Sequence, residues 1–150
     1  MLSILLPVYN CNCVALVTEL QRQCTECGTD FEIIAADDCS SVASYIEHNL
    51  RIERLDGVHY ITRKQNVGRS AIRNFLISQA QGEWLLFIDG DLTLNNPHFI
   101  RRYLQTKSNV VVGGIRIGGD PDRWKNNLRY RYEKAYEQKN TPQDRQCHAT

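Results

Sequence analysis

The sequence lacks a surplus of either charge. Its 18 lysine and arginine residues nearly balance 17 aspartate and glutamate residues, which gives a net charge of +1 at pH 7. Such a chain has no overall field that would attract nucleic acid or an anionic membrane. We therefore expect no nucleic-acid partner, and an anionic ligand would have to be held by local groups.

Long apolar runs are lacking too. Nothing in the chain approaches the roughly 20 consecutive apolar residues that a membrane-spanning helix needs. The N-terminal apolar run has no basic residues before it and stops at Pro7, unlike a secretory signal. We expect no transmembrane segment and a cytoplasmic protein, with a peripheral position at the inner membrane surface as the alternative.

Two phosphate-binding motifs are absent. No Gly-x-Gly-x-x-Gly follows the first expected strand, and no Gly-x-x-x-x-Gly-Lys-Ser/Thr occurs. These motifs are typical of dinucleotide-dependent oxidoreductases and of P-loop NTPases. Both classes are therefore disfavoured, and no internal repeat or low-complexity tract suggests a repeat architecture.

The six cysteines do not form a recognisable metal-ligand pattern. Cys11 and Cys13 are close in sequence, as are Cys24 and Cys27, but a four-ligand zinc site would need two such pairs brought side by side. We expect reduced thiols, with Cys24 and Cys27 packing near the end of a helix.

Strands and helices alternate along most of the chain. The length of 150 residues and a hydrophobic fraction of 42% fit one ordinary globular domain. Apolar runs predict strands at residues 2–9, 31–36, 58–62, 84–88 and 110–113, and helical spacing predicts helices at residues 14–27, 42–51, 67–79, 97–105 and 123–139. This alternation predicts an α/β fold with a mainly parallel sheet and helices on both faces.

The pattern changes after Gly113-Gly114. We expect an α/β core over residues 1–115, followed over residues 116–150 by a loop and a polar helix rich in tyrosine. An exposed helix is the simpler interpretation of that polar segment. The last ten residues carry no stop signal, so we expect the natural protein to continue into a further, acceptor-side region.

Polar clusters follow four of the expected strands: Tyr9-Asn10, Asp37-Asp38, residues 63–73, and Asp89-Gly90-Asp91. In an open α/β sheet, ligands bind beyond the carboxyl ends of the strands. Four clusters at such positions are hard to attribute to solvated loops alone, and together they predict a ligand site.

The Asp89-Gly90-Asp91 turn is a candidate metal site. Glycine permits a tight backbone between the two carboxylates, and oxygen ligands suit Mg²⁺ or Mn²⁺ that also binds a diphosphate. Asp-Gly is also a common turn, but its place directly after an apolar strand favours the metal interpretation.

Two other clusters offer groups for a nucleotide. Asp37 or Asp38 could accept hydrogen bonds from a nucleobase imide or a ribose hydroxyl, although Asp38 or Ser40 could instead cap a helix. A helix that opens with glycine and small residues, with Arg73 one turn beyond Arg69, favours phosphate. A solvated position is the alternative for Arg69.

In order and spacing these segments resemble the family 2 glycosyltransferases of the GT-A fold. The resemblance rests on residues 3–10, on Asp37-Asp38-Cys39-Ser40, on Asn66-x-Gly68-x-Ser70-x-x-Arg73-Asn74 and on Phe87-x-Asp89-Gly90-Asp91. It covers about residues 2–115. It implies a Rossmann-like nucleotide-binding sheet, a nucleoside-diphosphate sugar as donor with UDP favoured, a divalent cation (Mn²⁺ or Mg²⁺), and inversion at the anomeric carbon.

The resemblance also assigns roles to residues. The positions that would hold the nucleotide sugar are Pro7, Tyr9, Asn10, Asp37, Asp38, Asn66, Gly68, Arg73, Asp89 and Gly90. Asp38 would contact the base, Asp89 would touch ribose or sugar, and Asp91 would ligate the metal with Asp89 beside it. Cys39 stands where the family often has glycine.

No catalytic base is assigned. In this family the base is an acidic residue of the C-terminal half, and residues 146–150 resemble only the segment that leads into it. A base must lie within hydrogen-bond reach of the acceptor hydroxyl, and His148 near the chain end is a weak candidate. The resemblance implies a glycan or lipid-linked acceptor and a place in cell-surface polysaccharide biosynthesis.

The sequence leaves two other functions open. A sugar nucleotidyltransferase would need a basic, glycine-rich loop after the first strand, where this chain has Tyr9 to Cys13 without a basic residue. A phosphoacceptor signalling domain would have its acidic pair after the first strand and a lysine after the fifth. Here the pair follows the second strand, and Gly113-Gly114 takes the place of the lysine.

Overall fold

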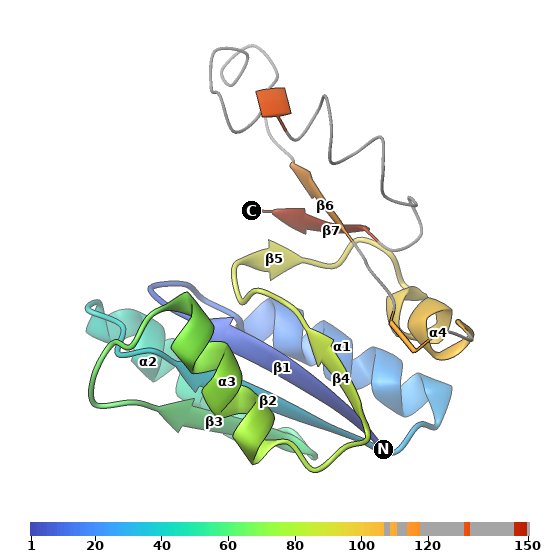
Figure 1. Cartoon of the computed structure of the whole chain (residues 1–150), viewed down its shortest axis with the longest axis horizontal. Helices are drawn as coiled ribbons and strands as arrows, with labels where there is room; N and C mark the ends of the chain where they lie inside the picture. Colours follow the sequence, from blue (N-terminus) through green and yellow to red (C-terminus); the bar gives the residue numbers. More distant parts are fainter. Residues whose placement is uncertain (107–108, 111–113, 118–130, 133–145, 150) are drawn as a thin grey trace. The chain divides into compact units, whose positions relative to one another are not determined.

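Four parallel strands form the sheet of the N-terminal part of the chain, in the order β3-β2-β1-β4 (Figure 1). The central strands are β1 (Leu2–Val8) and β2 (Phe31–Asp37), and the outer ones are β3 (Val58–Thr62) and β4 (Trp84–Phe87). Nearly every residue of β1 and β2 is buried, as expected for continuous apolar strands covered on both faces.

The structure is a computed structural model that describes residues 1–106, 109–110, 114–117, 131–132 and 146–149. The chain divides into two compact units, Met1–Asp91 and Leu92–Thr150. The expected core boundary at residue 115 stays a prediction, because many residues around it lie outside the described part.

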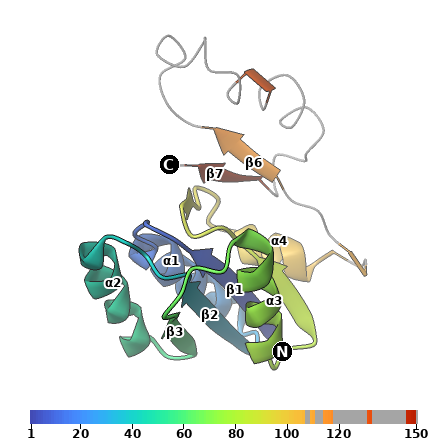
Figure 2. The same cartoon turned by 60° about the vertical axis from the view of Figure 1, so that its left-hand side comes forward.

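The first unit has helices on both faces of its sheet, which confirms the predicted α/β fold. These helices are α1 (Val14–Cys27), α2 (Ala43–Asn49), the short 3₁₀ helix η1 (Leu50–Arg54) and α3 (Arg69–Gln79). Helices α1 and α3 lie on opposite sides of the sheet (Figures 1 and 2).

Strand order explains this arrangement. The chain runs outward from β1 to β2 and β3, then crosses back to place β4 on the other side of β1. Because crossover connections between parallel strands are right-handed, a reversal of direction moves the next helix to the other face. The reversal creates a topological switch point between the carboxyl ends of β1 and β4, where open α/β sheets bind ligands.

Helix α3 closes the core on one face of the sheet. Its Ile72 and Leu76 pack with Leu5, Ile34 and Ala36 of the two central strands. This packing fixes the start of α3 close to the carboxyl ends of the strands.

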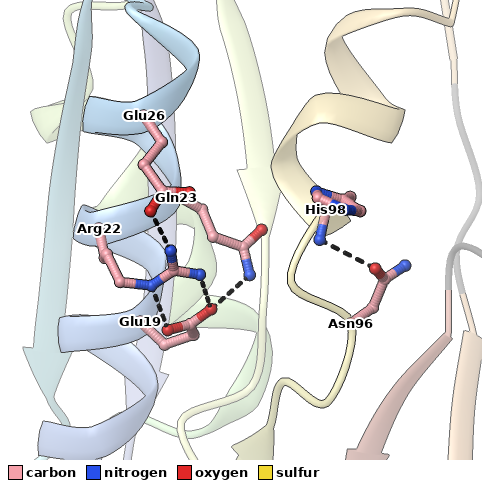
Figure 3. A network of polar contacts seen from close by, with 6 residues as sticks. All are labelled: Glu19, Arg22, Gln23, Glu26, Asn96 and His98. Atoms are coloured by element: carbon pink, nitrogen blue, oxygen red, sulfur yellow. Dashed lines mark hydrogen bonds and ion pairs between the residues drawn. The ribbon is translucent and has the colours of Figure 1, made fainter.

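Helix α1 ends at Gly28, whose φ of 62° is the left-handed conformation that favours glycine at a helix end. On its solvent side Arg22 lies between Glu19 and Glu26, and Gln23 also donates to Glu19 (Figure 3). The hydrogen bond from Arg22 lowers the pKa of Glu19. This network joins the charged side chains on the helix surface to the buried Gln23.

Three predicted elements of the first unit differ from the structure by more than one residue at an end or in their exposure. The helix expected at 42–51 is divided into α2 and η1. The helix expected from residue 67 begins at Arg69, because Gly68 has a φ of 85°. Strand β4 is confirmed as a strand but lies at the sheet edge, where Trp84, Leu85 and Phe87 are exposed.

The second unit contains a small mixed sheet in the order β5-β7-β6. Strand β7 (Gln146–Ala149) pairs antiparallel with β5 (Leu92–Thr93) and parallel with β6 (Gly114–Ile117). Helix α4 (Phe99–Leu104) follows a turn in which the side chain of Asn96 accepts a hydrogen bond of 2.9 Å from the His98 backbone (Figure 3).

Two predicted elements of this unit cannot be compared with the structure. The strand expected at 110–113 and the helix expected at 123–139 fall largely outside the described residues. The helix expected from Pro97 begins at Phe99. Among the described residues, no helix combines the length and apolar character that crossing a membrane requires.

Candidate functional site

A cavity of about 460 Å³ lies at the carboxyl ends of β1 and β4, at the switch point. It is lined by Pro7, Val8, Tyr9, Cys11, Asp38, Asn66, Gly68, Arg69, Ile72, Arg73, Asp89, Gly90 and Asp91. The fold thus brings together residues from all four polar clusters that follow the strands.

Gly90 packs directly against the end of β1. Its N–H donates to the carbonyl of Pro7 at 3.2 Å. A Cβ at this position would lie 3.0 Å from Cγ2 of Val8 and 3.2 Å from the Pro7 carbonyl, tighter than ordinary van der Waals contact. Glycine therefore lets the turn lie against β1, with Asp89 and the exposed Asp91 on either side of it.

Asp89 forms ion pairs with two arginines of α3. Oδ1 of Asp89 contacts Nη2 of Arg73, whose Nη1 also donates to the carbonyl of Arg69 at 3.2 Å. Oδ2 of Asp89 lies 3.7 Å from Nη2 of Arg69. The first aspartate of the turn is thereby tied to the beginning of α3.

Asp38 organises the loop before α3. Its two carboxylate oxygens accept hydrogen bonds from the backbone N–H groups of Val67 and Gly68 at 2.9 and 2.8 Å, and its carbonyl accepts one from the Asn66 amide at 2.9 Å. A carboxylate offers about four lone-pair sites. Asp38 can therefore hold this loop and still accept from a ligand in the cavity.

Asp37 has no exposed surface and does not line the cavity. Its carboxylate accepts from the backbone N–H and the hydroxyl of Ser40 at 2.6 and 2.7 Å, and from the hydroxyl of Tyr60 at 3.0 Å. Burial and the nearby Asp37 raise the pKa of Tyr60. Asp37 thus holds the loop that follows β2 through these three hydrogen bonds.

Asn10 also holds the loop between β2 and α2, and it is not among the residues that line the cavity. Its side-chain oxygen accepts from the backbone N–H groups of Ser41 and Val42 at 2.9 and 3.3 Å. The helix-cap alternative for Asp38 and Ser40 is wrong, because α2 begins after Val42 with no side-chain cap.

Sequence reasoning assigned no ligand-binding role to three cavity residues: Val8, Cys11 and Ile72. Arg69, for which the sequence left a phosphate-facing and a solvated position open, also lines the cavity. Cys11 belongs to no motif, and burial, followed by the nearby carboxylate of Asp91, raises the pKa of its thiol.

The buried Asn49 is a further residue that sequence reasoning missed. Its amide oxygen accepts from the backbone N–H of Cys13 at 3.0 Å, and its amide nitrogen donates to the carbonyl of Cys11 at 2.9 Å. A lone asparagine near a helix end carries no pattern that would have revealed this contact.

The protein groups of the turn are incomplete as a metal site by themselves. Within the described ranges, no group of three or more histidine, cysteine, aspartate or glutamate side chains could hold a metal ion. The Asp89 and Asp91 carboxylates are oxygen donors of the kind that Mg²⁺ and Mn²⁺ use together with phosphate oxygens and water. They fit a cation whose other ligands come from a bound diphosphate.

Bacterial transferases resemble this chain in sequence. The poly(ribitol-phosphate) beta-glucosyltransferase of Bacillus spizizenii is 33% identical over 123 residues, which cover 77% of this chain and 19% of the relative. The undecaprenyl-phosphate 4-deoxy-4-formamido-L-arabinose transferase of Pseudomonas aeruginosa is 30% identical, over 83% of this chain and 38% of its own length. The chain thus spans well under half of these relatives.

Solved structures resemble its fold. Residues 1–349 of Staphylococcus aureus TarS in complex with UDP-GlcNAc superpose with a TM-score of 0.64 and 23% identity, over 79% of this chain and 35% of that TarS chain. The glucosyl-3-phosphoglycerate synthase of Mycobacterium tuberculosis, solved with Mn²⁺ and UDP, has a TM-score of 0.54 and 18% identity, over 89% of this chain and 50% of the synthase. The fold is that of the GT-A glycosyltransferases.

The model of the family described as glycosyl transferase family 2 matches residues 3–149, almost the whole chain. This match confirms the resemblance that the four segments predicted, and the chain belongs to glycosyl transferase family 2.

Proposed function

We propose that this chain binds a nucleoside-diphosphate sugar in the cavity between β1 and β4, as the donor-binding part of a glycosyltransferase. The observation that carries the proposal is the Asp89-Gly90-Asp91 turn, packed against β1 and facing the loop and arginines at the start of α3. Carboxylates, arginines and a glycine-containing loop around one cavity suit a metal-bound diphosphate. Family membership and the fold of UDP-bound neighbours support the same ligand.

Within this cavity the nucleoside would lie against Pro7 and Tyr9, with Asp38 and Asn66 available to its base and ribose. Gly68 leaves space beside them, since nothing lies within 4 Å of a Cβ built on it. Asp37 and Asn10 act through the loops that they hold. UDP is the expected nucleotide, since related structures contain UDP, although one neighbour was solved with GDP-Man.

Asp91 would ligate the divalent cation, and Asp89 would stand beside it or contact ribose or sugar. A bound Mn²⁺ or Mg²⁺ would offset the charge that develops on the departing diphosphate. Arg73 keeps the Asp89 carboxylate oriented toward the cavity through their ion pair. Donor and acceptor then react with inversion at the anomeric carbon.

The acceptor is proposed to be a glycan or a lipid-linked substrate. Relatives named for poly(ribitol-phosphate) and for undecaprenyl-phosphate support this class and a role in cell-surface polysaccharide biosynthesis. No described residue is assigned as the base that activates the acceptor.

Calorimetric titration with UDP and with GDP, each with and without Mn²⁺, tests the proposal. The wild-type chain should bind one of these nucleotides more tightly with Mn²⁺. Asp91→Ala should lose most of the Mn²⁺-dependent gain, about tenfold or more in affinity, since one charge-assisted ligand contributes at least about 1.4 kcal/mol. Asp56→Ala, an exposed aspartate outside the cavity, is the matched control.

Two results would contradict the proposal. If the wild type binds neither nucleotide in the presence of Mn²⁺, the donor site is not in this cavity. If Asp91→Ala keeps the full Mn²⁺-dependent gain, the metal assignment is wrong even though nucleotide binding stands.

A further inference from the structure

We propose that Arg69 leaves Asp89 when the donor binds and contacts the diphosphate, holding it most strongly after the sugar has departed. This inference rests on the proposed function and adds to it a residue that binds the leaving group. It follows from the contrast between the two arginines that line the same cavity.

Arg73 is held in place and Arg69 is not. The side chain of Arg73 is 29% exposed and is fixed at two points, on Oδ1 of Asp89 and on the carbonyl of Arg69. The side chain of Arg69 is 84% exposed, and its ion pair with Asp89 spans 3.7 Å. Exposed pairs of this kind contribute little stability, about 0–1 kcal/mol. Moving the Arg69 side chain from Asp89 to a ligand therefore costs little free energy.

Loss of Arg69 does not leave Asp89 without a partner. Oδ1 of Asp89 keeps its contact with Arg73, which is the closer of the two pairs. The Asp38 carboxylate accepts two backbone N–H groups. Arg69 is thus the cationic side chain of the cavity that can be transferred to an anion with the least disturbance of other contacts.

The charge of the donor changes during the reaction in a way that suits such a residue. In a nucleotide sugar each phosphate carries one charge, which a single divalent cation can neutralise. Cleavage of the bond from the sugar leaves its electron pair on the terminal phosphate oxygen, so the released nucleoside diphosphate carries additional negative charge. A cation aimed where charge develops favours the reaction more than one that binds both states equally.

The same reasoning predicts that Arg69 discriminates between ligands by phosphate charge. Arg69→Gln should weaken UDP binding by roughly ten- to a hundredfold, the range expected for a charge-assisted hydrogen bond. Binding of UDP-GlcNAc should weaken less, and binding of uridine, which has no phosphate, should stay within about twofold. Arg69→Lys, which keeps the charge, should restore most of the UDP affinity.

Calorimetric titration of UDP, UDP-GlcNAc and uridine in the presence of Mn²⁺ measures these differences. Should the wild type prefer guanine, GDP, GDP-mannose and guanosine replace them. Arg54→Gln is the matched control, because Arg54 is an exposed arginine of η1 that does not line the cavity. It removes the same charge and should leave all three affinities unchanged.

The outcomes separate the two proposals. If the wild type binds UDP and Arg69→Gln binds it equally well, the role of Arg69 is wrong while the donor site stands. If Arg69→Gln loses UDP and uridine to the same extent, Arg69 acts on the shape of the site and the inference is overturned. If the wild type binds no nucleoside diphosphate, the proposed function itself fails, and this inference with it.

Discussion

Cys39 has a φ of 63°, in the left-handed region that residues with a Cβ rarely adopt. This conformation costs a non-glycine residue roughly 1–2 kcal/mol. Replacing Cys39 by glycine would remove that cost, but the larger entropy that glycine loses on folding offsets part of the stability gained. We expect Cys39→Gly to raise the free energy of unfolding by about 0.5–1 kcal/mol. Urea unfolding of the wild type and the variant measures this difference in the free energy of unfolding.

Cys39→Ala is the matched control for this substitution. It removes the thiol but keeps a Cβ in the same backbone conformation, so its stability should stay near that of the wild type. A gain of equal size in both variants would show that the thiol, not the backbone, is the source of the effect.

The two adjacent aspartates show how far single residues could be predicted. The acidic pair after a buried strand correctly indicated a place at the sheet edge, but the pattern could not tell which carboxylate faces the cavity. Asp37 is still the last residue of β2, and its carboxylate is buried against Tyr60 and Ser40. Asp38 lies one residue beyond and reaches the loop before α3. That difference depends on contacts with residues distant in sequence.

At the level of elements, the loop before β4 depends on a contact that no local pattern contains. The N–H of Gly82 donates to the hydroxyl of Ser3 at 2.8 Å, and that hydroxyl donates to Glu32 at 2.6 Å. Glu32 also accepts from the backbone N–H of Gln81 at 2.6 Å. This network joins the beginnings of β1, β2 and β4. It therefore lies at the amino ends of the parallel strands, and the cavity lies at their carboxyl ends.

Gly82→Ala should therefore destabilise the first unit. An added Cβ would lie 2.4 Å from Oγ of Ser3 and 2.8 Å from its backbone nitrogen, so the loop must shift and weaken the network. We expect a loss of about 2–3 kcal/mol, the upper part of the range for overpacking, measured by urea unfolding.

Gly28→Ala separates a steric clash from backbone strain. Gly28 has a φ of 62° and nothing within 4 Å of a Cβ built on it, so alanine there should cost only about 1–2 kcal/mol of conformational strain. A smaller loss for Gly82→Ala than for Gly28→Ala would contradict the clash.

The order and type of the four strands and three α-helices from β1 to β4 could be predicted, because apolar patterns mark most of them, but the division between α2 and η1 could not. The exposure of β4 could not be predicted. Its residues Trp84 to Phe87 form a run typical of a buried strand, yet the sheet order places it at an edge. The start of α3 was also placed two residues early, since Asp38 binds the N–H groups of Val67 and Gly68 from another loop.

For the whole molecule, every described residue that lines the cavity belongs to the first of the two units, Met1–Asp91. A ligand that binds only the folded form stabilises that form by about 2.7 kcal/mol at a free concentration of 100 times its Kd. Nucleotide and Mn²⁺ should therefore slow hydrogen exchange up to roughly a hundredfold for β1 and β2 amides that exchange through unfolding of this unit.

Amides of β6 and β7, which pair with each other in the second unit, provide the internal comparison in the same experiment. Their exchange should change little when the nucleotide binds, because none of the residues that the structure describes in that unit lines the cavity. Mass spectrometry of the exchanged peptides, with uridine plus Mn²⁺ as the weak-ligand control, measures both units at once. Equal slowing in β1 and in β6 and β7 would contradict a donor site formed by the first unit alone, since protection of the second unit requires that ligand binding also stabilise it.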